Sequence, residues 1–70
     1  MTTAPNVIQQ LRQLRINQGV NRYEMARRTG YYATTIARWE NGTHTPDSNA
    51  LTDLAQALGY NVVLRPRLEA

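Results

Sequence analysis

The sequence predicts an all-α fold, a compact domain of four to five helices followed by a short C-terminal β-strand. The 70 residues suffice for a single domain, whose core we place at about residues 6–59. Four amphipathic segments succeed one another, and each is followed by one of the four glycines, a residue that commonly ends helices. Only residues 60–67 change character, towards β-branched side chains that favour an extended strand.

The first two helices are predicted at about residues 7–18 and 22–29. Each follows an asparagine cap, and the residue three positions later can complete a reciprocal capping box. These pairs are Asn6 with Gln9 and Asn21 with Glu24. The inward-facing side chains are expected to be Ile8, Leu11, Leu14, Met25 and Ala26.

The third and fourth helices are predicted at about residues 33–41 and 48–58, the fourth with a cap at Asp47 or Ser48. In the third helix, Ile36 and Trp39 are three positions apart and should both point into the core. The other side of this helix then presents Ala33, Thr34, Ala37 and Arg38.

Residues 60–67 are predicted to form a dimerisation strand. One strand cannot satisfy its own backbone N–H and C=O groups, and no other segment of the chain is typical of a strand. The simplest partner is the same segment of a second copy across a twofold axis, with Val62, Val63 and Leu64 at its centre. The alternative is a loosely packed tail whose valines cover the helices.

Composition excludes several classes of function. The net charge is +3 and all eight basic residues are arginines, which suit bidentate contact with phosphate or guanine but are equally compatible with solvated helix faces. There is no cysteine for a disulfide or zinc site, and one histidine with five scattered carboxylates predicts neither an enzyme nor a cofactor. With no apolar run of roughly 18 residues and no signal sequence, we expect a soluble cytoplasmic protein without membrane contact.

Residues 21–42 are typical of a helix–turn–helix, two short helices joined by a glycine turn. Six features between residues 11 and 59 belong together: LRQLR (11–15), NRYEMA (21–26), Gly30, TIARWENG (35–42), Pro46 with Asp47, and LTDLAQALG (51–59). In this order and spacing they resemble the Cro/C1-type (XRE) family of helix-turn-helix proteins, which includes the lambdoid phage repressors. The resemblance implies a lambda-repressor-like domain that binds double-stranded DNA, with residues 33–41 as a recognition helix in the major groove.

Several residues match DNA-contacting positions of that family. Those expected to face base edges are Ala33, Thr34, Ala37 and Arg38. Those expected at phosphates are Arg22, Tyr32, Asn41, Thr43 and His44. Alternatives remain for three of them: Arg22 as a solvated first-turn residue, Arg38 on a phosphate instead of guanine, and His44 as an ordinary loop residue.

The chain departs from the family after the turn glycine, where it has two tyrosines. Tyr31 can fill the usual apolar slot, whereas Tyr32 is a poor N-cap whose hydroxyl can instead donate to a phosphate. The resemblance also implies a buried or half-buried ion pair between Arg15 and Glu40, which would orient the first helix against the end of the third.

Two functions compete at this point. The first is a transcriptional regulator, with repression as the usual outcome, that binds a palindromic operator as a homodimer. The second is the antitoxin of a toxin–antitoxin pair, which binds a toxin protein and autoregulates its operon. The terminal strand and the Arg-Pro-Arg sequence at residues 65–67 suit the second, because antitoxins of this kind can dimerise through such a strand.

Overall fold

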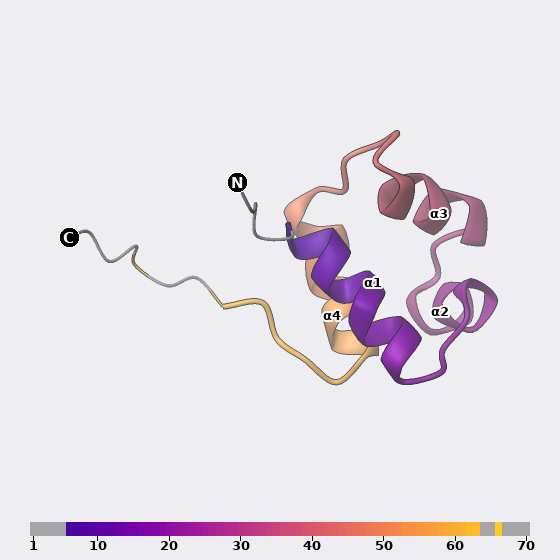
Figure 1. Cartoon of the computed structure of the whole chain (residues 1–70), viewed down its shortest axis with the longest axis horizontal. Helices are drawn as coiled ribbons and strands as arrows, with labels where there is room; N and C mark the ends of the chain where they lie inside the picture. The colour runs from indigo at the N-terminus through magenta and orange to yellow at the C-terminus, as the bar shows by residue number, and fades with distance from the viewer. Residues whose placement is uncertain (1–5, 64–65, 67–70) are drawn as a thin grey trace.

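The computed structural model describes residues 6–63 and residue 66, and this part of the chain contains four helices. They are α1 (Val7–Asn17), α2 (Arg22–Thr29), α3 (Ala33–Asn41) and α4 (Ser48–Ala57). As Figure 1 shows, α1 lies across α4, while α2 and α3 stand together at one end of the domain. Helix α2 packs against α3 and α4, and α1 packs against the same two helices.

Side-chain caps begin three of the four helices. Asn6, Asn21 and Asp47 each accept a hydrogen bond on Oδ1 from the backbone N–H three residues on, at 3.0, 2.8 and 2.8 Å. Such a bond satisfies one of the amides that a helix leaves unpaired at its start. Tyr32, which precedes α3, makes no side-chain cap bond, as the sequence predicted for so poor a cap.

The two residues predicted to complete the capping boxes, Gln9 and Glu24, make tertiary and local contacts through their side chains. The side-chain amide of Gln9 donates to the backbone carbonyl of Glu40 at 2.7 Å, which ties α1 to the end of α3. The Glu24 carboxylate accepts hydrogen bonds from Arg27 and Arg28. The cap half of each box is therefore confirmed, and the side chains of Gln9 and Glu24 add contacts that the capping box did not predict.

One face of each helix forms the core. Its buried members are Ile8, Leu11, Val20, Met25, Ile36, Leu54, Ala55 and Leu58. Ile36 has no exposed surface, and Trp39 packs against the cluster while staying partly accessible. The prediction that Ile36 and Trp39 hold the inner side of α3 is therefore confirmed.

The described part of the chain beyond α4 contains no β-strand, and residues 6–63 contain no fifth helix. Residues 60–63 run beside α1 and α4, with which they line a pocket, and no described segment pairs with them as a strand (Figure 1). The side chains of Val62 and Val63 are exposed. Leu64 lies outside the described residues. Among the described residues no neighbouring strand offers the N–H and C=O groups that a ladder requires, so residues 60–63 form no strand within this one chain.

None of the four helices is long and apolar enough to cross a lipid bilayer, a finding that covers only the described part of the chain.

Candidate nucleic-acid interface

The turn between α2 and α3 is built by a glycine and a threonine. Gly30 has φ +85°, a left-handed conformation that strains residues with a Cβ, and its N–H donates to the carbonyl of Ala26 at 2.8 Å. The hydroxyl of Thr29 donates to the carbonyl of Met25 at 2.9 Å and accepts from the N–H of Tyr31 at 3.2 Å. These bonds set the angle at which α3 leaves the turn.

An aromatic pair holds the inner side of α3. The rings of Tyr31 and Trp39 meet edge to face, with centroids 5.1 Å apart and planes at 78°. The Tyr31 hydroxyl donates to Oδ2 of Asp53 on α4 at 2.6 Å, and this bond to a carboxylate raises the pKa of Tyr31 to about 12. Tyr31 thus fills the apolar slot after the turn and fastens the start of α3 to α4.

The outer side of α3 borders a shallow groove. Its volume is about 220 Å³, and it is lined by Arg22, Tyr23, Ala33, Thr34 and Ala37. Four of these five residues were predicted at the DNA interface, and the structure brings them together from two helices. Arg38 lies one turn further along α3 from Thr34, and both side chains are exposed.

Tyr23 is the member of the groove that sequence reasoning missed. It occupies the second position of α2, and 80% of its surface is exposed. Its place two residues before the buried Met25 puts it on the opposite side of the helix, since two helical positions span roughly 200°. The sequence signal that could have identified Tyr23 is a large aromatic residue on the polar side of a helix.

The remaining predicted phosphate contacts lie at the two ends of α3. Tyr32 stands before the helix with 80% of its surface exposed, and Asn41, Thr43 and His44 are exposed at the other end. The backbone N–H groups of Thr43 and His44 donate to the carbonyl of Arg38, at 3.1 and 3.3 Å. A ligand at this corner would therefore meet side chains and not these two amides.

Behind the groove, Arg15 and Glu40 form a buried, two-pronged ion pair. Arg15 donates from Nε to Oε2 at 2.9 Å and from Nη2 to Oε1 at 2.8 Å. Its Nη1 donates to the carbonyl of Val20 at 2.8 Å, which also holds the link between α1 and α2. The arrangement joins α1, the following turn and the end of α3 through one guanidinium group.

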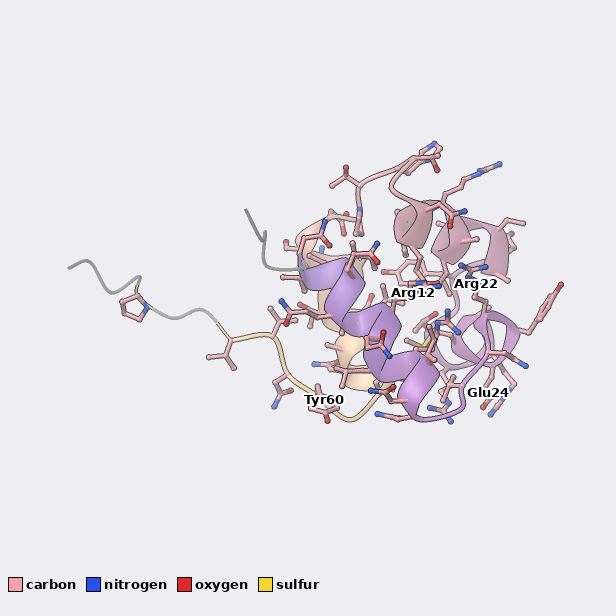
Figure 2. All side chains as sticks on the ribbon, in the orientation of Figure 1. Arg12, Arg22, Glu24 and Tyr60 are labelled. Atoms are coloured by element: carbon pink, nitrogen blue, oxygen red, sulfur yellow. The ribbon has the colours of Figure 1, made fainter. Side chains whose placement is uncertain are left out.

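Two further arginines converge on the same carboxylate. Nε of Arg22 donates to Oε1 of Glu40 at 2.9 Å, and Nε of Arg12 lies 3.9 Å from that oxygen. Figure 2 shows Arg12 and Arg22 close together, on the side of α2 that faces α1 and α3. Arg22 is thus more than a solvated first-turn residue, because part of its guanidinium is already engaged inside the protein.

A separate charged group lies on α2. The hydrogen bonds from Arg27 and Arg28 lower the pKa of the Glu24 carboxyl to about 2. Arg28 also donates from Nη1 to the carbonyl of Ala57 at 3.1 Å, which connects α2 to the end of α4. Neither Arg27 nor Arg28 contacts the groove, so this group stabilises the fold locally.

No group of three or more histidine, cysteine, aspartate or glutamate side chains that could hold a metal ion occurs within the part of the chain described here.

Comparison with known proteins identifies the family. Residues 9–68 match the family described as "Helix-turn-helix domain". Over 62 residues the chain is 36% identical to the "Uncharacterized HTH-type transcriptional regulator y4dL" of Sinorhizobium fredii (strain NBRC 101917 / NGR234), an alignment that covers 89% of this chain and 32% of that protein. The chain therefore spans about a third of the length of this relative. No solved structure matches it significantly. The match over most of its length shows that the chain belongs to the helix-turn-helix domain family.

Proposed function

We propose that the protein is a sequence-specific regulator of transcription, of the Cro/C1 type, that places α3 in the major groove of double-stranded DNA. The observation that carries this proposal is the groove in which Arg22 from α2 meets Ala33, Thr34 and Ala37 from α3. A recognition helix needs an outer side free for base edges and an inner side held by the domain. Ile36 and the Tyr31–Trp39 pair supply that inner attachment.

The outer side of α3 offers two kinds of base contact. Thr34 presents a hydroxyl and a methyl group, and Arg38 can donate to O6 and N7 of guanine. Ala33 and Ala37 are small and half-buried, so the helix can approach the base pairs closely and their methyl groups suit the methyl group of thymine. With so few hydrogen-bonding groups, part of the selectivity would come from DNA shape.

Phosphate contacts would frame the recognition helix. Arg22 follows the cap of α2, where the helix dipole favours an anion, and Tyr32 precedes α3 with an exposed hydroxyl. The exposed side chains of Asn41, Thr43 and His44 would contact the backbone at the far end of α3.

The proposed active form is a homodimer on a palindromic operator, and repression is the proposed outcome. Two recognition helices would then enter half-sites whose centres lie about 34–36 Å apart on one face of the duplex. The exposed Val62 and Val63 support a dimer contact in the C-terminal segment, since both are apolar side chains open to solvent. Sedimentation of a variant truncated after Asn61 tests this: a loss of the dimer supports the contact, and an unchanged dimer removes it.

Selection of bound sequences from a random duplex pool tests the main proposal, because it reports binding, half-site symmetry and spacing together. A plot of the logarithm of affinity against the logarithm of salt concentration should have a negative slope, the salt slope, of about 0.9 for each phosphate neutralised. Binding that does not change with salt, or a pool without any enriched sequence, would contradict recognition in the groove.

Two substitutions divide the roles within the interface. Arg38→Ala should relax the preference at one base position, whereas Arg22→Ala should weaken binding to all sequences alike. Because Arg22 also bonds Glu40, its variant needs a thermal unfolding control. Equal losses on specific and random duplexes for both variants would refute the assigned roles.

The alternative function, an antitoxin that binds a toxin protein and represses its own operon, is favoured by the same exposed valines. A protein partner would cover an apolar segment such as residues 60–63, whereas DNA would not. Co-expression with the product of the adjacent gene distinguishes the two functions: an antitoxin co-purifies with it and abolishes its toxicity, and a stand-alone regulator does neither.

A further inference from the structure

The arginines around Glu40 carry more positive charge than its single carboxylate can neutralise. Three guanidinium groups, those of Arg12, Arg15 and Arg22, lie within 3.9 Å of the carboxylate, so an excess of two positive charges remains. The side chain of Glu40 is only 3% exposed, whereas those of Arg12 and Arg22 are 41% and 35% exposed. The excess charge therefore faces solvent on Arg12 and Arg22.

Glu40 cannot neutralise all three arginines equally. Both of its oxygens already accept hydrogen bonds from the buried Arg15, and Oε1 accepts a further one from Arg22. Arg12, at 3.9 Å from Oε1, is too distant for a hydrogen bond, and this approach is the one polar interaction that the described residues show for its guanidinium. The Glu40 carboxylate therefore attracts the Arg12 guanidinium without forming a direct hydrogen bond to it.

We propose that Arg12 and Arg22 together bind one phosphate of the DNA backbone, which extends the DNA-contacting surface from α2 and α3 to α1. This inference rests on the proposed function. The Nε atoms of both residues lie within 3.9 Å of a single oxygen atom, so their guanidinium groups are close enough to share one anion of phosphate size. Figure 2 shows the two side chains next to each other.

Three features favour a phosphate as the ligand. Guanidinium donors match phosphate oxygens in a fork geometry, and each arginine retains Nη donors that are not bonded to Glu40 among the described residues. Arg22 is the first residue of α2, so the positive end of the helix dipole adds to the charge of the pair. Arg12 lies on α1, outside the groove beside α3, and so should fix position without reading bases.

The arrangement gives Glu40 a second role. Its contacts hold Arg22, and draw Arg12, towards one point before DNA arrives, which lowers the side-chain entropy lost on binding. Arg12 is accordingly a phosphate-binding residue, and Glu40 is a positioning residue that acts through the arginines.

The test compares Arg12→Gln with Arg27→Gln, using the duplex obtained by selection. Each variant loses one positive charge from an exposed arginine, but Arg27 pairs with Glu24 on α2 and lies outside the Glu40 cluster. We expect Arg12→Gln to bind specific and random duplexes about tenfold more weakly at roughly 0.1 M salt and to lower the salt slope by up to about 0.9, because Arg22 still contacts the shared phosphate. Arg27→Gln should leave the slope unchanged, and Arg12→Lys should restore it because lysine keeps the charge.

Replacing single phosphates of the duplex by neutral methylphosphonates locates the contact. The wild-type protein should lose affinity at one phosphate in each half-site where Arg12→Gln loses clearly less, because only Arg22 still contacts that phosphate in the variant. Arg27→Gln should keep the wild-type pattern. Thermal unfolding should give Arg12→Gln a midpoint near that of the wild type, which separates binding from folding.

Failure of this inference differs visibly from failure of the proposed function. If the wild type binds DNA with a steep salt dependence but Arg12→Gln keeps its slope and its methylphosphonate pattern, Arg12 contacts no phosphate. If no duplex shows salt-dependent binding to the wild type, the proposed function and the phosphate site are both overturned.

Discussion

Replacing Glu40 by glutamine should remove a large part of the stability of this domain. The substitution keeps the size of the side chain and one acceptor oxygen but deletes the negative charge that faces Arg15, Arg22 and Arg12. Arg15 is 8% exposed, so its guanidinium would remain buried without a counter-charge. Breaking a buried ion pair in this way costs about 3–5 kcal/mol.

The exposed arginines change this estimate little. Arg12 and Arg22 can turn to water, and surface pairs contribute only about 0–1 kcal/mol each. We therefore expect a loss of about 3 kcal/mol, against a total of roughly 4–10 kcal/mol for a domain of this length. At a denaturant slope of about 1 kcal/mol/M, the urea midpoint should fall by about 3 M.

Urea unfolding followed by far-ultraviolet circular dichroism measures this loss. The matched control is Glu24→Gln, which removes the carboxylate of an exposed cluster and should shift the midpoint far less. The double variant Arg15→Met/Glu40→Leu should recover part of the loss, because apolar side chains can replace a buried pair at little cost. A Glu40→Gln midpoint within experimental error of the wild type would refute the reasoning, as would a double variant less stable than the single one.

Three further predictions each concern a single residue. Hydrogen bonds from Arg27 and Arg28 lower the pKa of Glu24 to about 2. The stability that these bonds contribute is therefore present above the ordinary pKa of 4.5 and is lost as pH falls towards 2. The stability difference between the wild type and Glu24→Gln should therefore shrink over this interval in urea unfolding, and a constant difference would contradict it. Gly30→Ala should lower the free energy of unfolding by about 1–2 kcal/mol in the same assay, because φ at Gly30 is +85°. An added Cβ meets nothing within 4 Å, so the loss would come from the backbone conformation alone. An unchanged midpoint would disprove this explanation. Hydrogen bonding to Asp53 raises the pKa of Tyr31 to about 12. The stability that this bond contributes is therefore complete below the ordinary pKa of 10.0 and is lost as pH rises towards 12. Spectrophotometric titration should lose this high transition in Tyr31→Phe and see its pKa fall in Asp53→Asn, and persistence in either variant would remove the assignment.

The helices were predictable because their signals are local. The caps at Asn6, Asn21 and Asp47 and the glycines that follow the helices depend on only a few neighbouring residues, and α1, α2 and α4 begin directly after these caps. The side of α3 that faces the core was equally predictable, because Ile36 and Trp39 repeat at helical spacing.

The C-terminal segment shows where such reasoning ends. The β-branched residues 62–63 favour an extended backbone, but a strand exists only where a second backbone offers hydrogen bonds. Propensity resides in the residue, whereas pairing depends on a partner that the sequence does not specify.

By itself, the sequence determined four helices, three of them with side-chain caps, and which side of α3 carries Ile36 and Trp39 into the core. Only the tertiary structure decided that Gln9 bonds the carbonyl of Glu40, that Tyr23 enters the groove, and that Arg12 joins the carboxylate. These contacts join residues from different helices, and their geometry follows from how the helices pack. Local sequence signals set where a helix begins and which side it buries, whereas packing sets which charges meet.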